Sequence, residues 1–148
     1  MTDIETISNE MGELIKNPGD DSDVILVVYL FGSVLKKKLE TVSDIDFAFL
    51  LKTKEYIHDP IQSSYPAYRV ALEIGLKFNK KTDVTILNSS SIEIAYEVIT
   101  TGRCIYEYNM DIRFEYEAKI RGMYLDFRPF LMDLRARTIE QIIKRSNH

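Results

Sequence analysis

The stretch Leu30–Leu50, LFGSVLKKKLETVSDIDFAFL, decides both the fold class and the chemistry of this chain. It joins two apolar runs, Val24–Phe31 (VILVVYLF) and Asp44–Leu51 (DIDFAFLL). Short runs of β-branched and aromatic residues with polar or glycine-containing flanks are typical of buried strands. We therefore predict two strands, separated by a polar connection that is rich in lysine over residues 36–41.

Two aspartates, Asp44 and Asp46, open the second predicted strand. Side chains alternate between the faces of a strand, so both carboxylates point to one side while Ile45 and Phe47 point to the other. Two like charges so placed repel each other unless a cation lies between them, and hard divalent cations prefer oxygen ligands. Asp83 opens a later predicted strand and supplies a third carboxylate if the two strands are neighbours. Three converging carboxylates suit two magnesium ions and a nucleotide triphosphate.

Gly32 and Ser33 come directly after the first predicted strand. A glycine there lets the backbone turn sharply and approach an anion, and backbone N–H groups with the Ser33 hydroxyl can bind phosphate oxygens. A helical turn over Val34–Lys38 would add a favourable dipole at the same place. Lys36 and the two lysines that follow it bring positive charge. We therefore expect Gly32, Ser33 and Lys36 to bind the phosphates of a nucleotide.

The rest of the chain predicts a mixture of helices and strands, hence an α+β fold with a small mixed sheet flanked by helices. Residues up to about Ser64 after the second strand are expected to form a loop. The long C-terminal segment is helical in pattern, with Pro129 expected to kink or break it. Its apolar stripe from Tyr116 to Leu134 is expected to pack in the core, and the alternative is a helix that overhangs the sheet and offers a groove to a partner. The other expected elements are a helix over Ile4–Ile15, a helix over Tyr68–Phe78, a strand over Asp83–Leu87, a helix from a Ser90 or Ser91 cap to Thr101, a strand over Arg103–Tyr108 and a helix over Ile112–Lys144.

The chain has 148 residues, of which 45% are hydrophobic and 28% charged, as in an ordinary globular protein. We expect one domain over residues 1–148, with a core over about 24–108 and a helical segment over about 110–146. Cys104 is the only cysteine, which excludes a disulfide framework. The formal net charge of −4 argues against wholesale nucleic-acid binding. No apolar run reaches the length of a membrane helix, and the first 16 residues lack a signal peptide's basic start, so we expect a cytoplasmic protein.

Gly32-Ser33, ten intervening residues and Asp44-Ile45-Asp46 together resemble the Gly-Ser-x10-Asp-x-Asp signature of the DNA polymerase β-like nucleotidyltransferase superfamily. Asp83, in KKTDVTIL, matches the third carboxylate of that superfamily. Chain length and the C-terminal sequence narrow the resemblance to the minimal MntA-type antitoxins, which pair with HepT-type HEPN ribonuclease toxins. The loop departs from many minimal members, because it has Val34, Leu35, Lys36 and Lys37 where they have an arginine-containing Gly-Ser-Arg-Ala-Arg-Gly pattern.

The resemblance implies a magnesium-dependent transfer of AMP from ATP to a tyrosine hydroxyl of the toxin. Asp44, Asp46 and Asp83 would then be catalytic metal ligands, and two Mg²⁺ ions are implied. Gly32 and Ser33 would hold the β- and γ-phosphates with help from Lys36. The implied partner is a HEPN-family ribonuclease in a hetero-oligomer with this chain.

Two other functions remain open from the sequence. One is the same chemistry on a small-molecule acceptor, such as an aminoglycoside hydroxyl. The other is a non-catalytic antitoxin that neutralises its partner by binding alone. Replacing Asp44 and Asp46 by asparagine separates the enzymatic functions from the last one, because only simple occlusion survives the loss of both carboxylates.

Overall fold

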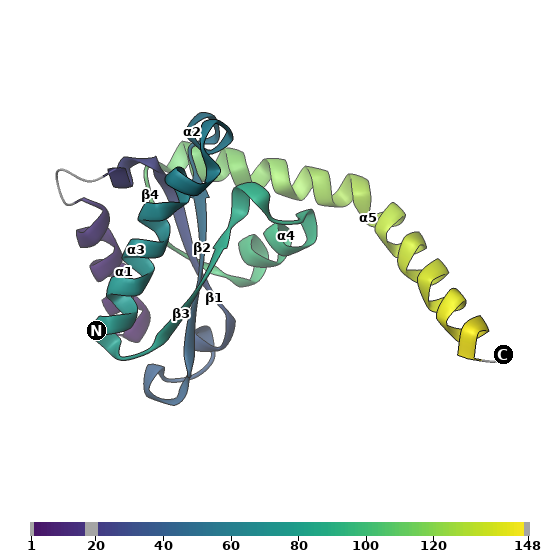
Figure 1. Ribbon diagram of the computed structural model, residues 1–148, viewed down its shortest axis with the longest axis horizontal. Helices are drawn as coiled ribbons and strands as arrows, with labels where there is room; N and C mark the ends of the chain where they lie inside the picture. Colours follow the sequence, from purple (N-terminus) through teal and green to yellow (C-terminus); the bar gives the residue numbers. More distant parts are fainter. Residues whose placement is uncertain (1, 17–20, 147–148) are drawn as a thin grey trace.

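The computed structural model describes residues 2–16 and 21–146, and its centre is a four-stranded sheet in the order β3-β2-β1-β4 (Figure 1). The sheet is mixed, because β1 pairs antiparallel with both β2 and β4 whereas β2 and β3 are parallel. The strands are β1 (Ile25–Phe31), β2 (Asp44–Leu51), β3 (Lys81–Ile86) and β4 (Arg103–Glu107). This arrangement confirms the predicted α+β class with a small mixed sheet.

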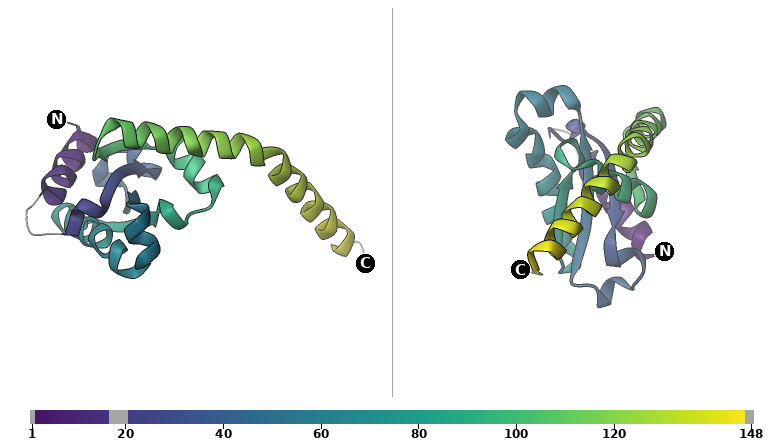
Figure 2. Two further views of the ribbon diagram at one scale, coloured as in Figure 1. Left: turned by 90° about the horizontal axis from the view of Figure 1, so that it is seen from above. Right: turned by 90° about the vertical axis from the view of Figure 1, so that its right-hand side faces the viewer.

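Helices cover both faces of the sheet (Figure 2). The long helices α1 and α3 contribute buried apolar residues to one core cluster, and α4 with the first part of α5 contributes to a second cluster on the opposite face. The helices are α1 (Asp3–Ile15), α2 (Thr53–His58), α3 (Pro60–Phe78), α4 (Ile92–Thr101) and α5 (Met110–Ser146). Short 3-10 turns are η1 (Asp21–Val24), η2 (Gly32–Leu35), η3 (Leu39–Thr41) and η4 (Leu87–Ser89).

Successive side chains of β2 point to opposite faces of the sheet, and this decides which of them pack against α1 and α3. Ile45, Phe47 and Phe49 are fully buried in the cluster that β2 shares with α1 and α3. Because the pleat has a period of two, Asp44 and Asp46 are held on the opposite face. A one-residue slip in register would bury both carboxylates in an apolar core, so core packing enforces the position of the charges.

The connection after β2 differs from the predicted loop, because α2 begins at Thr53 and α3 begins at Pro60. Asp59 caps α3 by accepting a hydrogen bond from the backbone N–H of Gln62 at 3.1 Å. Pro60 occupies the first turn, where its missing N–H costs nothing. Sequence reasoning treated the proline as a loop signal, whereas the Asp-Pro pair is the start of a helix here. The prediction of a loop to about Ser64 was therefore wrong.

The long C-terminal helix was correctly predicted, but its surroundings were not. α5 contains Pro129 without being interrupted, and Figure 1 shows that the helix changes direction along its course. Ile120 is buried, whereas Phe127, Phe130 and Leu134 are at least half exposed. The apolar stripe therefore joins the core only in its first turns, and the second half of α5 extends away from the sheet (Figure 2). None of the described helices is both long and apolar enough to cross a lipid bilayer.

A buried polar network fastens the first part of α5 to the sheet. Tyr29, on β1 and 2% exposed, donates a hydrogen bond from its hydroxyl to Glu117 Oε1 at 2.9 Å. Arg113 Nη1 donates to the same oxygen at 3.3 Å, and Arg113 Nε donates to Glu107 at the end of β4. Burial and the Glu117 carboxylate raise the pKa of Tyr29, so its hydroxyl stays protonated and remains a donor.

We predict that Glu117→Ala lowers the free energy of unfolding by about 2–3 kcal/mol, because it leaves a buried hydroxyl and a guanidinium without their acceptor. Tyr29→Phe should cost less, about 1 kcal/mol, since Arg113 still pairs with the carboxylate. Urea denaturation monitored by circular dichroism measures both. Glu115→Ala, at an exposed position of the same helix, should change stability by no more than about 0.5 kcal/mol. Equal losses for Glu117→Ala and Glu115→Ala would show that the network contributes nothing.

Candidate active site

Asp46 and Asp83 are direct partners across the parallel β2–β3 ladder. Asp44 precedes Asp46 by two positions on the same face of β2, and its own ladder partner is Lys81. Asp44 and Asp46 are half-buried, and Asp83 is exposed to solvent. The structure therefore brings together the three carboxylates singled out from the sequence, in the corner where β2 and β3 begin.

The pKa of Asp46 is raised above its ordinary value of 3.8. Burial is the largest cause, followed by the negative charge of Asp83 and a hydrogen bond between the two carboxyl groups. Asp44 adds a smaller repulsion in the same direction. The charges of Asp83 and Asp44 thus disfavour the ionised form of Asp46. A cation placed among them would reverse this effect.

Gly32 fits against Asp46 because it has no side chain. Its φ of +83° lies in the left-handed region, and a Cβ atom there would lie 2.2 Å from Asp46 Oδ2. Phe31, the residue before it, is the ladder partner of Asp46 in β1. Ser33 follows in the exposed turn η2, and its carbonyl accepts the N–H groups of both Lys36 and Lys37 at 3.0 Å. Gly32 and Ser33 therefore border the carboxylates on the β1 side, opposite Asp83.

The lysines that follow η2 are exposed to solvent. Lys36 caps the end of η2 and is exposed, as are Lys37 and Lys38. Val34, by contrast, is 3% exposed and packs in the core cluster shared with α1 and α3. The buried Val34 side chain thus anchors the turn, while the three lysines that follow it remain in solvent.

Lys81 is a charged residue of this corner that sequence reasoning did not single out. As ladder partner of Asp44 it lines, together with that carboxylate, a hollow of about 710 Å³ below the starts of β2 and β3. The neighbouring Lys80 has a structural role, because its Nζ donates to the carbonyl of Val42 at 2.7 Å and so fastens the turn that leads into β2. The Lys81-x-Asp83 spacing, parallel to Asp44-x-Asp46, was the signal that could have found Lys81.

The carboxylates fit magnesium by their chemistry. Within residues 2–16 and 21–146, no three Asp, Glu, His or Cys side chains form a ready-made metal-binding group. Mg²⁺ does not require one, because it is usually bound by one or two carboxylates together with substrate phosphates and water. Asp46 and Asp83 supply such a pair, with Asp44 next to it. The residues present therefore suit a magnesium ion that arrives with a nucleotide.

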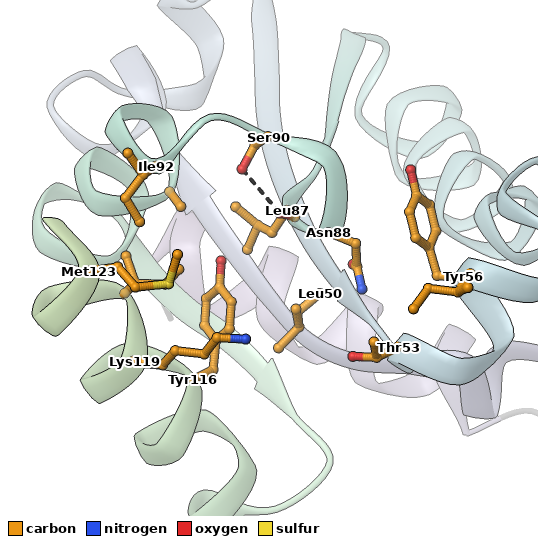
Figure 3. A pocket seen from close by; sticks show the side chains of 13 residues that line it. Leu50, Thr53, Tyr56, Leu87, Asn88, Ser90, Ile92, Tyr116, Lys119 and Met123 are labelled. Carbon is orange, nitrogen blue, oxygen red and sulfur yellow. Dashed lines mark hydrogen bonds between the residues drawn. The ribbon is translucent and has the colours of Figure 1, made fainter. Parts of the chain in front are cut away.

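A second concavity, of about 350 Å³, lies at the other end of β2 between η4, α4 and α5 (Figure 3). Its lining is mostly apolar, and the Tyr116 hydroxyl on its wall is buried and has no hydrogen-bond partner in the described part of the chain. Burial raises the pKa of Tyr116. Asn88 is already engaged, because its side chain bonds both the N–H and the carbonyl of Leu51. None of the predicted site residues lines this pocket.

The geometry can now be compared with known proteins. A family model described as polymerase beta nucleotidyltransferase matches residues 13–111, which is more than half of the chain and includes every candidate site residue. The chain belongs to this nucleotidyltransferase family. Membership makes the protein a nucleotidyltransferase, as the sequence motif predicted. No curated protein matches the chain in sequence.

Solved structures with the same fold come from toxin–antitoxin complexes. A chain of a toxin–antitoxin MntA–HepT structure has a TM-score of 0.59 and 20% identity, covering 94% of this nucleotidyltransferase and 98% of that chain. A complex of tri-AMPylated Shewanella oneidensis HEPN toxin with MNT antitoxin gives 0.60 and 21%, covering 95% and 98%. A toxin–antitoxin structure with AMP-PNP gives 0.60 and 21%, covering 92% and 98%. At this identity the likeness establishes the shared fold.

Gly32→Ala should destabilise the nucleotidyltransferase by about 1–2 kcal/mol, because alanine resists the left-handed backbone and its methyl group would overlap Asp46. The displaced carboxylate should also weaken the binding of Mn²⁺, measured by titration calorimetry in the presence of ATP. Gly122→Ala is the matched control, since nothing lies within 4 Å of a Cβ at that helical position. It should leave metal binding unchanged and raise stability slightly. Unaltered metal binding in Gly32→Ala would contradict the proposed contact with Asp46.

Asp46→Asn should stabilise the metal-free protein at neutral pH. A raised folded-state pKa means that ionisation of Asp46 opposes folding, so its unfavourable contribution is absent below the usual carboxyl pKa and appears as the pH rises through the folded-state pKa. The gain from asparagine should therefore grow from acid to neutral pH in urea denaturation with EDTA present. A gain that is constant with pH would show that charge is not its cause.

Proposed function

We propose that this nucleotidyltransferase transfers AMP from ATP to a tyrosine hydroxyl of a HEPN-family ribonuclease and so acts as the antitoxin of a toxin–antitoxin pair. The observation that carries the proposal is the Asp46–Asp83 pair with Gly32 packed against it. The fold likeness to toxin–antitoxin structures, one of which contains a tri-AMPylated HEPN toxin, supports the choice of acceptor.

The assigned roles follow from the positions of the residues. Asp44, Asp46 and Asp83 would hold Mg²⁺, two ions in the full site, and the metal would neutralise charge that develops on the phosphates. Gly32 and Ser33 would bind the β- and γ-phosphates through backbone N–H groups and the Ser33 hydroxyl, with Lys36 adding positive charge. These contacts would keep the leaving end of ATP on the β1 side of Asp46.

The reaction is a single displacement at the α-phosphorus. The acceptor oxygen forms a bond to that phosphorus while the bond to the bridging oxygen of the β-phosphate breaks, and pyrophosphate leaves. Asp83 is exposed and, besides holding the metal, would receive the proton of the acceptor hydroxyl. Burial of Asp46 serves the same step, because a partly desolvated carboxylate binds a cation more strongly than a solvated one does.

The test combines the chain with a HEPN-family ribonuclease from the same genome, ATP and Mg²⁺, and determines the mass of the ribonuclease. Wild-type protein should add one or more AMP units to a tyrosine and abolish ribonuclease activity. The double variant Asp44→Asn/Asp46→Asn should add none, with at least a thousandfold lower rate, because both proposed metal ligands are lost. Asp126→Asn, exposed on α5, is the control and should be fully active.

The outcome for neutralisation decides between enzyme and simple binder. If the double variant still silences the ribonuclease while transferring nothing, the protein neutralises by occlusion and the enzymatic proposal is wrong. If wild-type protein modifies an aminoglycoside but no ribonuclease, the chemistry stands and the acceptor is wrong. We expect neither result.

A further inference from the structure

The geometry of the displacement fixes the side from which an acceptor must come. The attacking and leaving oxygens lie on opposite sides of the phosphorus atom. Gly32 and Ser33 border Asp46 on the β1 side, whereas Asp83 is its partner on the β3 side. With pyrophosphate leaving toward Gly32 and Ser33, the hydroxyl must enter past Asp83. β3 is the outer strand of the sheet, so this approach crosses an open sheet edge.

An exposed apolar stripe runs along α3 beside this edge. Its five members are between 54% and 88% exposed and recur at intervals of three or four residues, which places them on one side of the helix. They are Ile61, Tyr65, Tyr68, Leu72 and Leu76. Gly75, the neighbour of the last member, packs against Lys80 and Thr82 at the start of β3. Aligned large apolar side chains of this kind are typical of protein-binding surfaces.

One end of the stripe reaches the hollow at the starts of β2 and β3. Leu76 lines the same hollow as Asp44 and Lys81. At the other end, Tyr65 and Tyr68 line a second hollow, of about 480 Å³, with Ile86 at the end of β3. The stripe therefore runs along β3, from the hollow lined by Asp44 and Lys81 to the hollow lined by Ile86.

The charge beside the stripe also indicates the character of its partner. Lys81 is exposed and has no ion-pair partner among the described residues, although Asp44 is its ladder neighbour. An exposed lysine without an ion-pair partner can pair with an acidic residue at the border of a docked protein. An apolar surface with one basic end suits a protein that presents an apolar helix face with acidic residues at its border.

We propose that the stripe and Lys81 together form the acceptor surface, on which the protein substrate docks by such a helix face. This inference rests on the proposed function, because it takes the direction of attack from AMP transfer. It adds the surface and the chemistry of the docking partner, neither of which the catalytic residues specify.

The second half of α5 is the competing surface. Met132 and Ile139 are each 57% exposed there. Figures 1 and 2 show that this part of the helix leaves the body of the protein and points away from the sheet. A partner held only by that arm would not be placed at the β3 edge. The arm therefore provides a matched control for the acceptor surface.

The experiment measures AMP transfer to the HEPN-family ribonuclease at a concentration below saturation, together with the dissociation constant for ATP. Leu72→Glu should lower the rate of transfer at least tenfold and leave ATP affinity unchanged, because Leu72 is 60% exposed and does not touch the carboxylates. Tyr65→Glu, at the other end of the stripe, should act in the same way. Ile139→Glu on the arm and the conservative Leu72→Met should both keep the wild-type rate. Circular dichroism establishes that each variant is folded.

Each outcome has one meaning. Wild-type rates for both Leu72→Glu and Tyr65→Glu, or a loss confined to Ile139→Glu, would overturn the acceptor surface while leaving the proposed function intact. Failure of wild-type protein to bind ATP or to transfer AMP to any ribonuclease would instead overturn the proposed function, and the acceptor surface with it.

Discussion

The repulsion between two carboxylates, Asp46 and Asp83, is the constraint on which the rest of the site depends. The pair exists because the core leaves the chain no alternative: Phe47 and Phe49 must face α1 and α3, so Asp46 must face the other way. The parallel register then sets Asp83 beside it. The repulsion within this pair lowers the stability of the metal-free protein, and a bound cation would relieve it. Such a cost is common where stability and function compete.

The backbone around the pair is adapted to it. Gly32 adopts a left-handed conformation that brings the end of β1 against the Asp46 carboxylate, and no other residue leaves room there. Lys80 holds the turn before β2 through the carbonyls of Glu40 and Val42. Asp3 of α1 accepts the backbone N–H of Leu39 at 3.0 Å, which ties the same turn to the first helix. The site is therefore built on short, fastened connections and not on a free loop.

Part of this was predictable from local sequence. Strand periodicity placed Asp44 and Asp46 on one face, and Gly32-Ser33 after a buried run predicted the tight turn. The pairing of Asp46 with Asp83 depends on the register of two strands that are separated by two helices, α2 and α3, and no local pattern specifies that register. Asp59-Pro60 was misread because a proline taken by itself signals a turn or loop. A proline that follows an aspartate cap also favours the first turn of a helix. Lys81 was passed over because a lysine before a strand is usually only a solvated flank.

The packing of α5 shows that apolar periodicity alone does not distinguish a buried part of a helix from an exposed one. The apolar periodicity of this helix continues unchanged past Ile120, yet only its first turns are buried. What fixes those turns is the polar network of Tyr29, Arg113 and Glu117, which pattern analysis could not see because it joins residues far apart in the chain. Tyr124 still stacks on Tyr96 of α4, but beyond it the apolar side chains of the same pattern are exposed. Identical signals therefore describe core in one part of the helix and surface in the other.

The most direct test of the central claim is a crystal structure of the chain grown with Mn²⁺ and a non-hydrolysable ATP analogue, with anomalous scattering used to locate the metal. Manganese bound between Asp46 and Asp83, with the α-phosphate on it and the terminal phosphates at Gly32 and Ser33, is the result predicted. A nucleotide bound elsewhere, or metal absent from this carboxylate pair in a crystal that contains the nucleotide, would contradict the account.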